Sequence, residues 1–355
     1  MLQEGTIQKA AAQFGYGDPV ISTLTEGLIH HTFRVGFTGS NASKPIVLQC
    51  INIATFSQPE NIIHNYRLIY ECIDSNKTVR IAPLVPTHEG KWFWRDGEGN
   101  FWRAIAFIDN SYTRLSAENP SEACKAAYCF AAFTRALTSI DPQQLAVIIP
   151  RFHDLAYRYE QFEEAISKAT IQRLLKSTHV IAELRQRKKL VDLYLSFQTN
   201  PAFVTRLMHH DCKMSNVLLD TTNKEVICPV DLDTVMPGLF FSDLGDMIRS
   251  MAGTTDENST RWEDIAIRKD YYDAIVAGYL SGMDNSFTNE EKAHIHYSGI
   301  LMLFMQSLRF VTDFLNNDTY YKTTYPEQNL NRALNQLIML EKLEEFVSGE
   351  YGYKL

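Results

Sequence analysis

The stretch LMHHDCKMSNVLLD, residues 207–220, places two histidines, an aspartate, a cysteine and an asparagine between apolar flanks. A zinc site is one interpretation, but no second Cys or His pair at ligand spacing lies nearby. A nucleophilic Cys212 is another, but closeness to a histidine in sequence does not establish the geometry of a catalytic triad. The third interpretation fits the spacing H-x-D-x-x-x-x-N, which His209, Asp211 and Asn216 form.

This spacing is typical of a catalytic loop for phosphoryl transfer. The reaction needs a carboxylate beside the acceptor hydroxyl, for which Asp211 is the candidate. It also needs hard oxygen ligands for Mg²⁺, for which Asn216 is the first candidate. The segment VDLD, residues 230–233, follows an apolar run and places Asp231 where a kinase-like fold has its second Mg²⁺-binding aspartate. The acidic segment DLGD, residues 243–246, then opens a predicted helix, and these motifs together are far more specific than any one alone.

Outward from this stretch, the chain changes character near residues 107–111. Residues 18–108 read mainly as strands punctuated by glycines, with a helix at 58–73 and a hairpin at 91–108 around Asp96-Gly97-Glu98-Gly99. Later apolar residues recur mostly at helical spacing, except in a short predicted hairpin at 216–233. We therefore expect an α+β fold with a β-rich N-terminal lobe, residues 1–108, and a large, mainly helical C-terminal lobe, residues 109–355.

Composition limits the possible partners. The chain has 355 residues and a formal net charge of −8, and it lacks the Lys/Arg run that a nucleic-acid partner usually requires. Its first residues lack the apolar core of a signal peptide. The apolar segment 299–310 is shorter than the roughly 18 residues that span a membrane, so it predicts a buried helix. The six cysteines have no CxxC spacing. We expect a cytoplasmic monomer or homodimer with free thiols and with no membrane or nucleic-acid partner.

The order HxDxxxxN, VDLDTVMPG and DLGD resembles the aminoglycoside phosphotransferase and choline kinase-like superfamily, and more narrowly the N-acetylhexosamine 1-kinases. Further stretches are similar to the narrower group: LQCIN (48–52), WRAIAFIDNS (102–111), IPRFHDLAYRYEQFEEAI (149–166), LRFVTDFLNNDTYY (308–321) and NLNRALNQ (329–336). The resemblance implies a bilobal protein kinase-like fold with ATP and Mg²⁺ as cofactors. It also implies transfer of a phosphoryl group to the anomeric hydroxyl of N-acetylglucosamine or N-acetylgalactosamine.

For the reaction centre, the resemblance implies that Asp211 is the catalytic base and that Asn216 and Asp231 bind Mg²⁺. Lys213 either approaches the γ-phosphate or is an ordinary solvated lysine. Three roles stay open for Asp233: binding sugar hydroxyls, contacting a metal-bound water, or supporting the structure.

For the nucleotide, the resemblance implies contacts from the hairpin containing Gly27 and from a hinge formed by Phe107, Ile108 and Asp109. Kinases of this fold usually carry a lysine on the next strand to pair with the phosphates, but Gln49 occupies that position. Another donor must then supply the charge, and Arg67, Lys213 and Mg²⁺ itself are the candidates.

For the sugar, the resemblance implies contacts from Arg309 and Tyr320 in the helical lobe. Arg309 lies in an otherwise apolar helix and needs a partner, which is either the substrate or a structural carboxylate. The alternative for Tyr320 is an ordinary surface tyrosine. Asp243 is implied to brace the catalytic loop.

Two rival functions remain at the level of sequence. One is a kinase of another small alcohol or amine, such as an aminoglycoside, choline or a homoserine-like acceptor. A pocket rich in donors such as Arg309 would argue against a polycationic acceptor. The other is a non-catalytic pseudokinase that serves as a binding module, which Gln49 suggests and which the presence of Asp211, Asn216 and Asp231 opposes.

Overall fold

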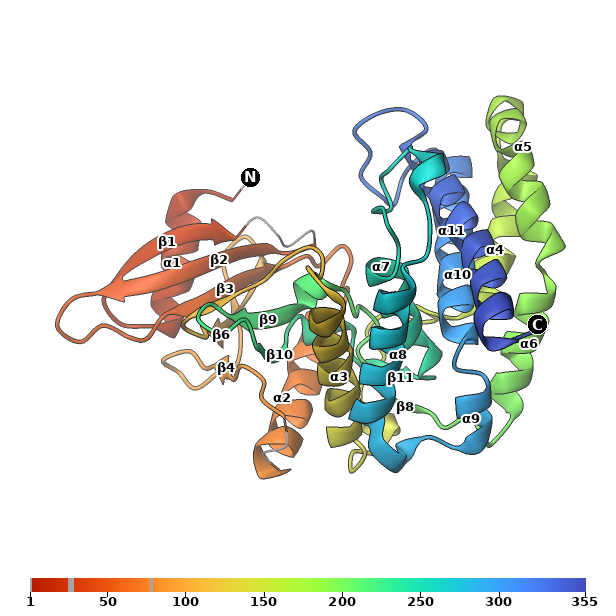
Figure 1. The fold of residues 1–355 in the computed structure, drawn as a ribbon. Coiled ribbons are helices and arrows are strands. Elements are labelled where there is room, and N and C mark those ends of the chain that lie inside the picture. The colour runs from red at the N-terminus through yellow and green to blue at the C-terminus, as the bar shows by residue number, and fades with distance from the viewer. Residues whose placement is uncertain (1, 25–28, 77–78) are drawn as a thin grey trace. The chain divides into compact units, whose positions relative to one another are not determined.

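The computed structural model describes residues 2–24, 29–76 and 79–355, and Figure 1 labels its elements. The helices are α1 (Glu4–Phe14), α2 (Pro59–Asn76), α3 (Pro120–Ala136), α4 (Leu155–Lys168), α5 (Ile171–Gln186), α6 (Lys189–Thr199), α7 (Phe241–Met251), α8 (Lys269–Met283), α9 (Asn289–Ala293), α10 (Tyr297–Leu315) and α11 (Gln328–Tyr351). The strands are β1 (Asp18–Leu24), β2 (His31–Thr38), β3 (Ile46–Ile51), β4 (Leu84–Val85), β5 (Trp94–Arg95), β6 (Phe101–Ala106), β7 (Ser111–Tyr112), β8 (Arg206–Met208), β9 (Val217–Asp220), β10 (Val226–Pro229) and β11 (Met236–Gly238).

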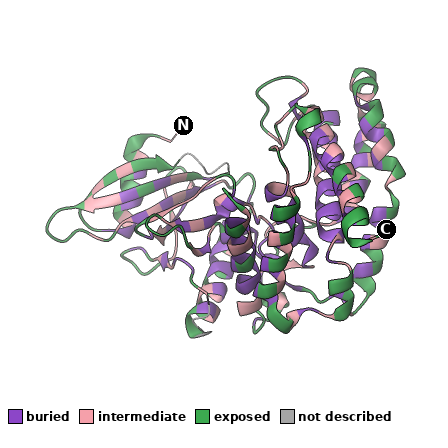
Figure 2. Cartoon of the chain, viewed as in Figure 1, coloured by how far each residue is buried: buried purple, intermediate pink, exposed green. Residues whose placement is uncertain are grey.

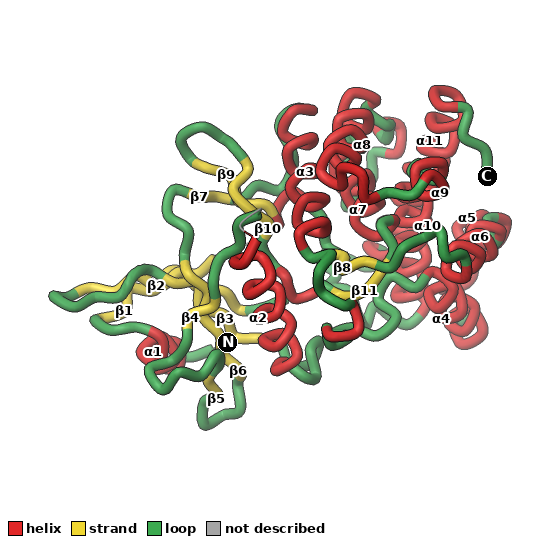
Figure 3. Tube along the Cα trace, turned by 90° about the horizontal axis from the view of Figure 1, so that it is seen from below, coloured by secondary structure: helices red, strands yellow, loops and turns green. Residues whose placement is uncertain are grey.

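The chain divides into two compact units. Unit 1 consists of Met1–Thr113, Ala136–Ile149 and Ser215–Met236. Unit 2 consists of Arg114–Arg135, Pro150–Met214 and Pro237–Leu355. Most of the strands belong to unit 1 and most of the helices to unit 2. Figure 3 colours the helices red and the strands yellow.

Unit 1 is built on an antiparallel sheet in the order β1-β2-β3-β6-β4, with β5 also paired to β6. Successive strand residues point to opposite faces of the sheet. One face packs against α1 and buries Phe33 and Leu48 in a shared core. The strand register pairs Thr32 on β2 with Gln49 on β3, and Gln49 with Arg103 on β6. Along each strand these residues alternate with those of the core that faces α1. Their side chains therefore project from the face away from α1.

The predicted hairpin at residues 91–108 is confirmed as β5 and β6, which pair in antiparallel fashion. Its turn closes through a hydrogen bond from the Gly99 N–H to the Asp96 carbonyl at 3.1 Å. The first strand is shorter than the aromatic pattern predicts, since β5 has only two residues. The reason is competition for one edge of β6, because β4 pairs with Ala104 and Ile105 just beyond the β5 contacts.

Two later segments return to unit 1. The predicted hairpin at 216–233 is confirmed as β9 and β10, and β9 also pairs with β7. The side-chain amide of Asn65 exchanges two hydrogen bonds with the backbone of Ala146, at 2.8 and 2.9 Å, and so ties residues 136–149 to α2. The expected lobes, residues 1–108 and 109–355, are each one continuous segment. The compact units differ from them because these long-range hydrogen bonds return two segments to the N-terminal part.

Helix α10 is the core of unit 2 and packs against α4, α5, α7 and α11. It confirms the buried helix predicted for residues 299–310. Within the described residues it is the one helix long and apolar enough to cross a membrane, but 83% of its apolar window is buried inside the protein. The buried faces of the helices that surround it can be followed in Figure 2. Its apolar character is therefore that of a core helix.

Candidate active site

The loop that follows β8 is held in place by Asp243, near the start of α7. The backbone N–H groups of His209 and His210 donate to the two carboxylate oxygens of Asp243 at 2.9 and 2.8 Å. His210 has a φ of 66°, a conformation that L-residues rarely adopt and that needs support from its surroundings. The expected bracing role of Asp243 is therefore confirmed.

Asp211 follows at once, and its carboxylate accepts a hydrogen bond from Lys213 Nζ at 2.9 Å. Both side chains are partly exposed, so substrate can reach the carboxylate. Cys212, between them, is buried. Burial, together with the charges of Asp243 and Asp246, raises the pKa of the Cys212 thiol well above its ordinary value. A buried thiol that stays protonated is a poor nucleophile, so Cys212 is a packing residue.

The two expected Mg²⁺ ligands, Asn216 and Asp231, lie at the same end of the β9–β10 hairpin. The Val230 N–H donates to the Asn216 carbonyl at 2.9 Å and joins the two segments. Strand β10 ends at Pro229, before the end of the apolar run, because Asp231 takes a left-handed conformation with φ 61° and ψ 57°. An amide oxygen and a carboxylate are the hard donors that Mg²⁺ prefers, so this pair fits that ion.

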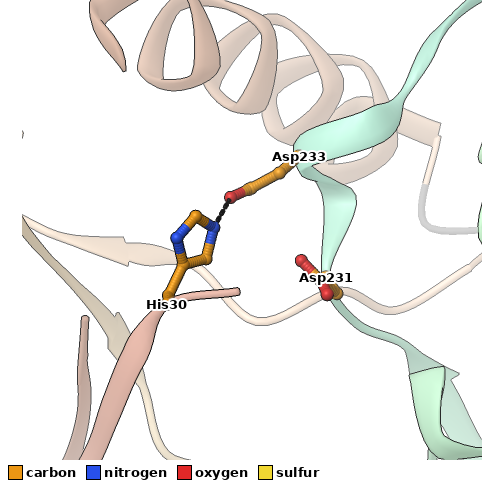
Figure 4. A group of neighbouring side chains, drawn as sticks. All are labelled: His30, Asp231 and Asp233. Atoms are coloured by element: carbon orange, nitrogen blue, oxygen red, sulfur yellow. Dashed lines mark hydrogen bonds and ion pairs between the residues drawn. The ribbon is translucent and has the colours of Figure 1, made fainter. Parts of the chain in front are cut away.

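Ligand atoms of His30, Asp231 and Asp233 lie within 4.8 Å of one another (Figure 4). His30 Nδ1 accepts a hydrogen bond from the backbone N–H of Asn52 at 3.1 Å, so a neutral ring carries its proton on Nε2. That proton is donated to Asp233 Oδ2 at 2.8 Å. In this tautomer Nε2 is the hydrogen-bond donor to Asp233 and has no lone pair for a metal ion. Among residues 2–24, 29–76 and 79–355 no other group of three such ligand atoms lies as close together.

Asp233 is 2% exposed and forms a bidentate ion pair with Arg103, which is 1% exposed, at 2.6 and 2.8 Å. Burial alone raises the pKa of Asp233, but Arg103 and His30 outweigh burial and hold this pKa well below its usual range. Arg103 Nε donates to Gln49 Oε1 at 2.9 Å, and Gln49 Nε2 donates to Thr32 Oγ1 at 3.3 Å. The geometry favours the structural role for Asp233. It does not favour a nucleotide contact from Gln49, because both ends of that amide have partners.

The expected hinge, residues 107–109, links β6 to β7. The Phe107 N–H donates to the Pro45 carbonyl at 3.1 Å, and the side chain of Ile108 is buried. The segment is thereby fixed to the sheet of unit 1, and its contact with adenine stays a prediction. Gly27, the other expected nucleotide contact, lies outside the described residues.

In unit 2, Arg309 on α10 and Arg158 on α4 are both half-buried. Arg309 donates to Gln306 Oε1 at 3.1 Å. Arg158 donates to the Phe152 carbonyl and to Gln161 Oε1, each at 2.8 Å. Neither guanidinium forms an ion pair with a carboxylate in the part of the chain that the structure describes. Burial, and then repulsion from Arg309, lowers the pKa of Arg158 to about 10.

The guanidinium of Arg309 also lies 5.2 Å from the ring of Phe152 and 5.6 Å from that of Tyr321. The Tyr321 hydroxyl is buried and has no hydrogen-bond partner among the described residues. The backbone N–H groups of Tyr320 and Tyr321 donate to the carboxylate of Asp313 at 2.8 and 2.9 Å, which fixes their loop to α10. Tyr320 itself is 64% exposed, so its sugar contact stays a prediction.

Arg158 and Arg309 form a positive cluster, and His153 connects this cluster to the loop that follows β8. Its ring centroid lies 4.4 Å from that of Phe152 and 5.2 Å from that of His210, and its Nδ1 contacts Ser242 Oγ. Burial lowers the pKa of His153 well below its ordinary value, and the charges of His210 and Arg309 lower it further. The cluster therefore adjoins the catalytic loop within unit 2.

Asp246, on α7, places an acceptor atom in the same neighbourhood. It is 3% exposed, and Arg249 Nε donates to its Oδ1 at 2.9 Å. Its Oδ2 is buried and has no hydrogen-bond partner within the described ranges. Burial and the charge of Asp211 raise the pKa of Asp246, although Arg249 opposes them. Arg249 also pairs with Glu257 at 2.8 Å.

Three residues of this arrangement were not predicted from the sequence: Arg103, Arg158 and His153. Arg103 did carry a signal, since it is a lone arginine in the apolar strand FWRAIA and needs a partner for the same reason as Arg309. Arg158 and His153 lie in the stretch 149–166, which resembles the N-acetylhexosamine 1-kinases, but the resemblance assigned no role to either residue.

The chain matches the model of the phosphotransferase enzyme family over residues 21–284. Similar solved structures include a microcompartment-associated aminopropanol kinase, with 13% identity, 98% of each chain covered and a TM-score of 0.65. A spectinomycin phosphotransferase in complex with ADP and spectinomycin has 14% identity, covers 97% of this chain and 99% of its own, and has a TM-score of 0.61. An amicoumacin kinase in complex with AMP-PNP and Ca²⁺ has 14% identity, coverages of 96% and 94%, and a TM-score of 0.62. These likenesses confirm the predicted α+β protein kinase-like fold.

Proposed function

Because the chain belongs to the phosphotransferase enzyme family, we propose that it transfers the γ-phosphoryl group of ATP to the anomeric hydroxyl of N-acetylglucosamine or N-acetylgalactosamine. Asp211 orients that hydroxyl and accepts its proton. Asn216 and Asp231 hold Mg²⁺, which neutralises phosphate charge when it is bound. Lys213 keeps a positive charge beside the catalytic carboxylate.

The observation that carries this choice of acceptor is the pair Arg158 and Arg309 beside the catalytic loop. Two half-buried guanidinium groups that have no carboxylate partner among the described residues repel a cationic acceptor, and juxtaposed like charges cost several kcal/mol. The same groups are well suited to bind oxygen acceptors, because each presents several N–H donors in a fixed plane. A neutral sugar with hydroxyl and acetamido oxygens therefore suits these two arginines better than an aminoglycoside or choline.

Two further groups support a polyhydroxy acceptor. Asp246 Oδ2 is a buried acceptor without a partner among the described residues, and it can receive a hydrogen bond from a sugar hydroxyl. The Tyr321 hydroxyl is likewise buried without a hydrogen-bond partner among the described residues, and the face of its ring lies next to Arg309. Aromatic faces and planar donors are common means of binding sugar rings and their oxygens.

A matched acceptor panel tests the proposal. Release of ADP would be measured with ATP and Mg²⁺ in the presence of N-acetylglucosamine, N-acetylgalactosamine, glucosamine, choline, homoserine or kanamycin. N-acetylglucosamine and glucosamine differ by an acetyl group and a positive charge. We expect turnover with both N-acetylhexosamines and at least tenfold lower kcat/KM with glucosamine, since each tenfold corresponds to about 1.4 kcal/mol of repulsion.

Arginine variants identify the source of this preference. The change Arg309→Gln should raise KM for N-acetylglucosamine and reduce the discrimination against glucosamine. The control Arg185→Gln should change neither, because Arg185 is a half-exposed arginine on α5 that pairs with Glu163. Preferred turnover of a cationic acceptor would support the rival kinase. Nucleotide binding without transfer to any acceptor would support the pseudokinase.

A further inference from the structure

Strand β3 has Gln49 in place of the lysine that is usual at this position, and the neighbouring strand β6 carries a positive charge on Arg103. Gln49 and Arg103 are direct partners in the antiparallel register of β3 and β6. Gln49 suits this position because one end of its amide accepts from Arg103 while the other donates to Thr32. A lysine at position 49 could donate to Thr32 but could not accept a hydrogen bond from Arg103. It would also place a like charge against Arg103. The glutamine and the arginine therefore form one arrangement.

Arg103 does not take over the phosphate contact of the usual lysine. Its side chain is 1% exposed, and each of its three guanidinium nitrogens donates a hydrogen bond to Gln49 or Asp233. Burial opposes its charge, but the carboxylates of Asp233 and, less strongly, Asp231 outweigh burial and hold the pKa of Arg103 above its ordinary value. The guanidinium therefore acts on the neighbouring protein carboxylates.

The ion pair fixes the segment that carries Asp231. Asp231 is in a left-handed conformation, with φ 61° and ψ 57°, which costs an L-residue more than the right-handed one. Asp233 follows within the short 3-10 turn Leu232–Thr234, and its carboxylate is fixed by Arg103 on β6 and by His30 next to β2. Because Asp233 is held by Arg103 and His30 only two positions later, the same contacts restrict the backbone of Asp231.

We propose that Arg103 is a positioning residue for the divalent cation: through its ion pair with Asp233 it holds Asp231 in the conformation that binds the cation, without contacting the cation itself. Partners of metal ligands commonly act in this way, and their loss lowers metal affinity by about 10- to 100-fold. The inference rests on a cation at Asn216 and Asp231 but not on the identity of the acceptor.

The test measures cation binding without any acceptor. Mn²⁺ would be titrated into the full-length protein with saturating AMP-PNP, and the free ion would be followed by electron paramagnetic resonance. Arg103→Lys keeps the charge but loses the bidentate geometry. The matched control is Arg206→Lys in unit 2, where Arg206 forms a buried bidentate pair with Glu291 at 2.6 and 2.9 Å.

We expect Arg103→Lys to weaken Mn²⁺ affinity by about tenfold and Arg206→Lys to leave it unchanged. Both variants should lower the melting temperature, so thermal stability alone does not separate them. Wild-type Mn²⁺ affinity in a folded Arg103→Lys protein would overturn the proposal and leave Arg103 a purely structural residue. If that variant does not fold, Asp233→Asn weakens the same ion pair from its other end while keeping the size of the side chain. Wild-type Mn²⁺ affinity in a folded Asp233→Asn protein would overturn the proposal equally.

Discussion

Arg103 and Arg309 both lie in otherwise apolar elements, and a buried guanidinium needs a partner. Arg103 has a carboxylate at 2.6 Å, so its charge is compensated within the protein. Among the described residues Arg309 donates to the amide of Gln306 and faces two aromatic rings but forms no ion pair with a carboxylate, so its charge can serve a ligand. The difference separates a residue that holds structure from one that can recognise substrate, although their sequence contexts are alike.

His153 is a residue whose protonation makes the fold sensitive to acid. Burial and neighbouring positive charges depress its folded-state pKa. Above the unfolded pKa of about 6.5 the imidazole is neutral in both states. Below it the unfolded chain binds a proton that the folded protein does not. The free energy of unfolding therefore falls with decreasing pH, by at most about 1.4 kcal/mol per pH unit for this one group, until the folded pKa is reached.

The change His153→Gln should remove this contribution. Urea unfolding measured between pH 7 and 5 should show a shallower loss of stability in the variant than in the wild type. His179→Gln is the control, because His179 is exposed on α5 and should leave the slope unchanged. Parallel wild-type and His153→Gln curves over this range would contradict a neutral His153 in the folded protein.

At the scale of elements, α7 and α10 set the position of the catalytic loop. Helix α7 carries Asp243, which holds that loop, and Asp246, which adjoins it. The glycine between them allows the close approach of α10, because a Cβ at Gly245 would lie 2.3 Å from the Ser298 carbonyl oxygen. The glycine of the DLGD motif is therefore required by helix packing.

The change Gly245→Ala should push α7 away from α10. Because the contact is with backbone, we expect a loss of about 1–3 kcal/mol in the free energy of unfolding, measured with urea. Gly349→Ala on α11 is the matched control. Nothing lies within 4 Å of its Cβ, so we expect a gain of about 1 kcal/mol from helix propensity. An unchanged or raised stability in Gly245→Ala would show that the two helices can separate at no cost.

The elements that a local sequence pattern marks were predictable from the sequence. Helical spacing predicted α2 and α10, and the aspartate–glycine turn predicted the β5–β6 hairpin. The order of motifs pointed to Asp211, Asn216 and Asp231 as site residues, and their roles stay predictions. Contacts between distant segments were not predictable, because nothing local marks a register that puts Gln49 opposite Arg103.

At the scale of the whole molecule, the arrangement depends on pairs far apart in the chain. Arg103 and Asp233 are separated by 130 positions, and His30 and Asp233 by 203. Such contacts return the segment Ser215–Met236 to unit 1, so the expected Mg²⁺ ligands belong to the unit with the sheet. Asp211 belongs to unit 2 although it precedes Asn216 by only five positions. One continuous stretch therefore supplies catalytic candidates to both units.

The position of the new phosphate ester on the sugar tests the proposed reaction most directly. N-acetylglucosamine would be incubated with ATP, Mg²⁺ and the protein, and the product would be examined by proton–phosphorus correlation NMR. We predict a phosphorus resonance that is coupled to the anomeric proton. We also predict no product from Asp211→Asn under conditions in which that variant remains folded. Coupling to the protons at C6, or the same product at a wild-type rate from Asp211→Asn, would contradict these predictions.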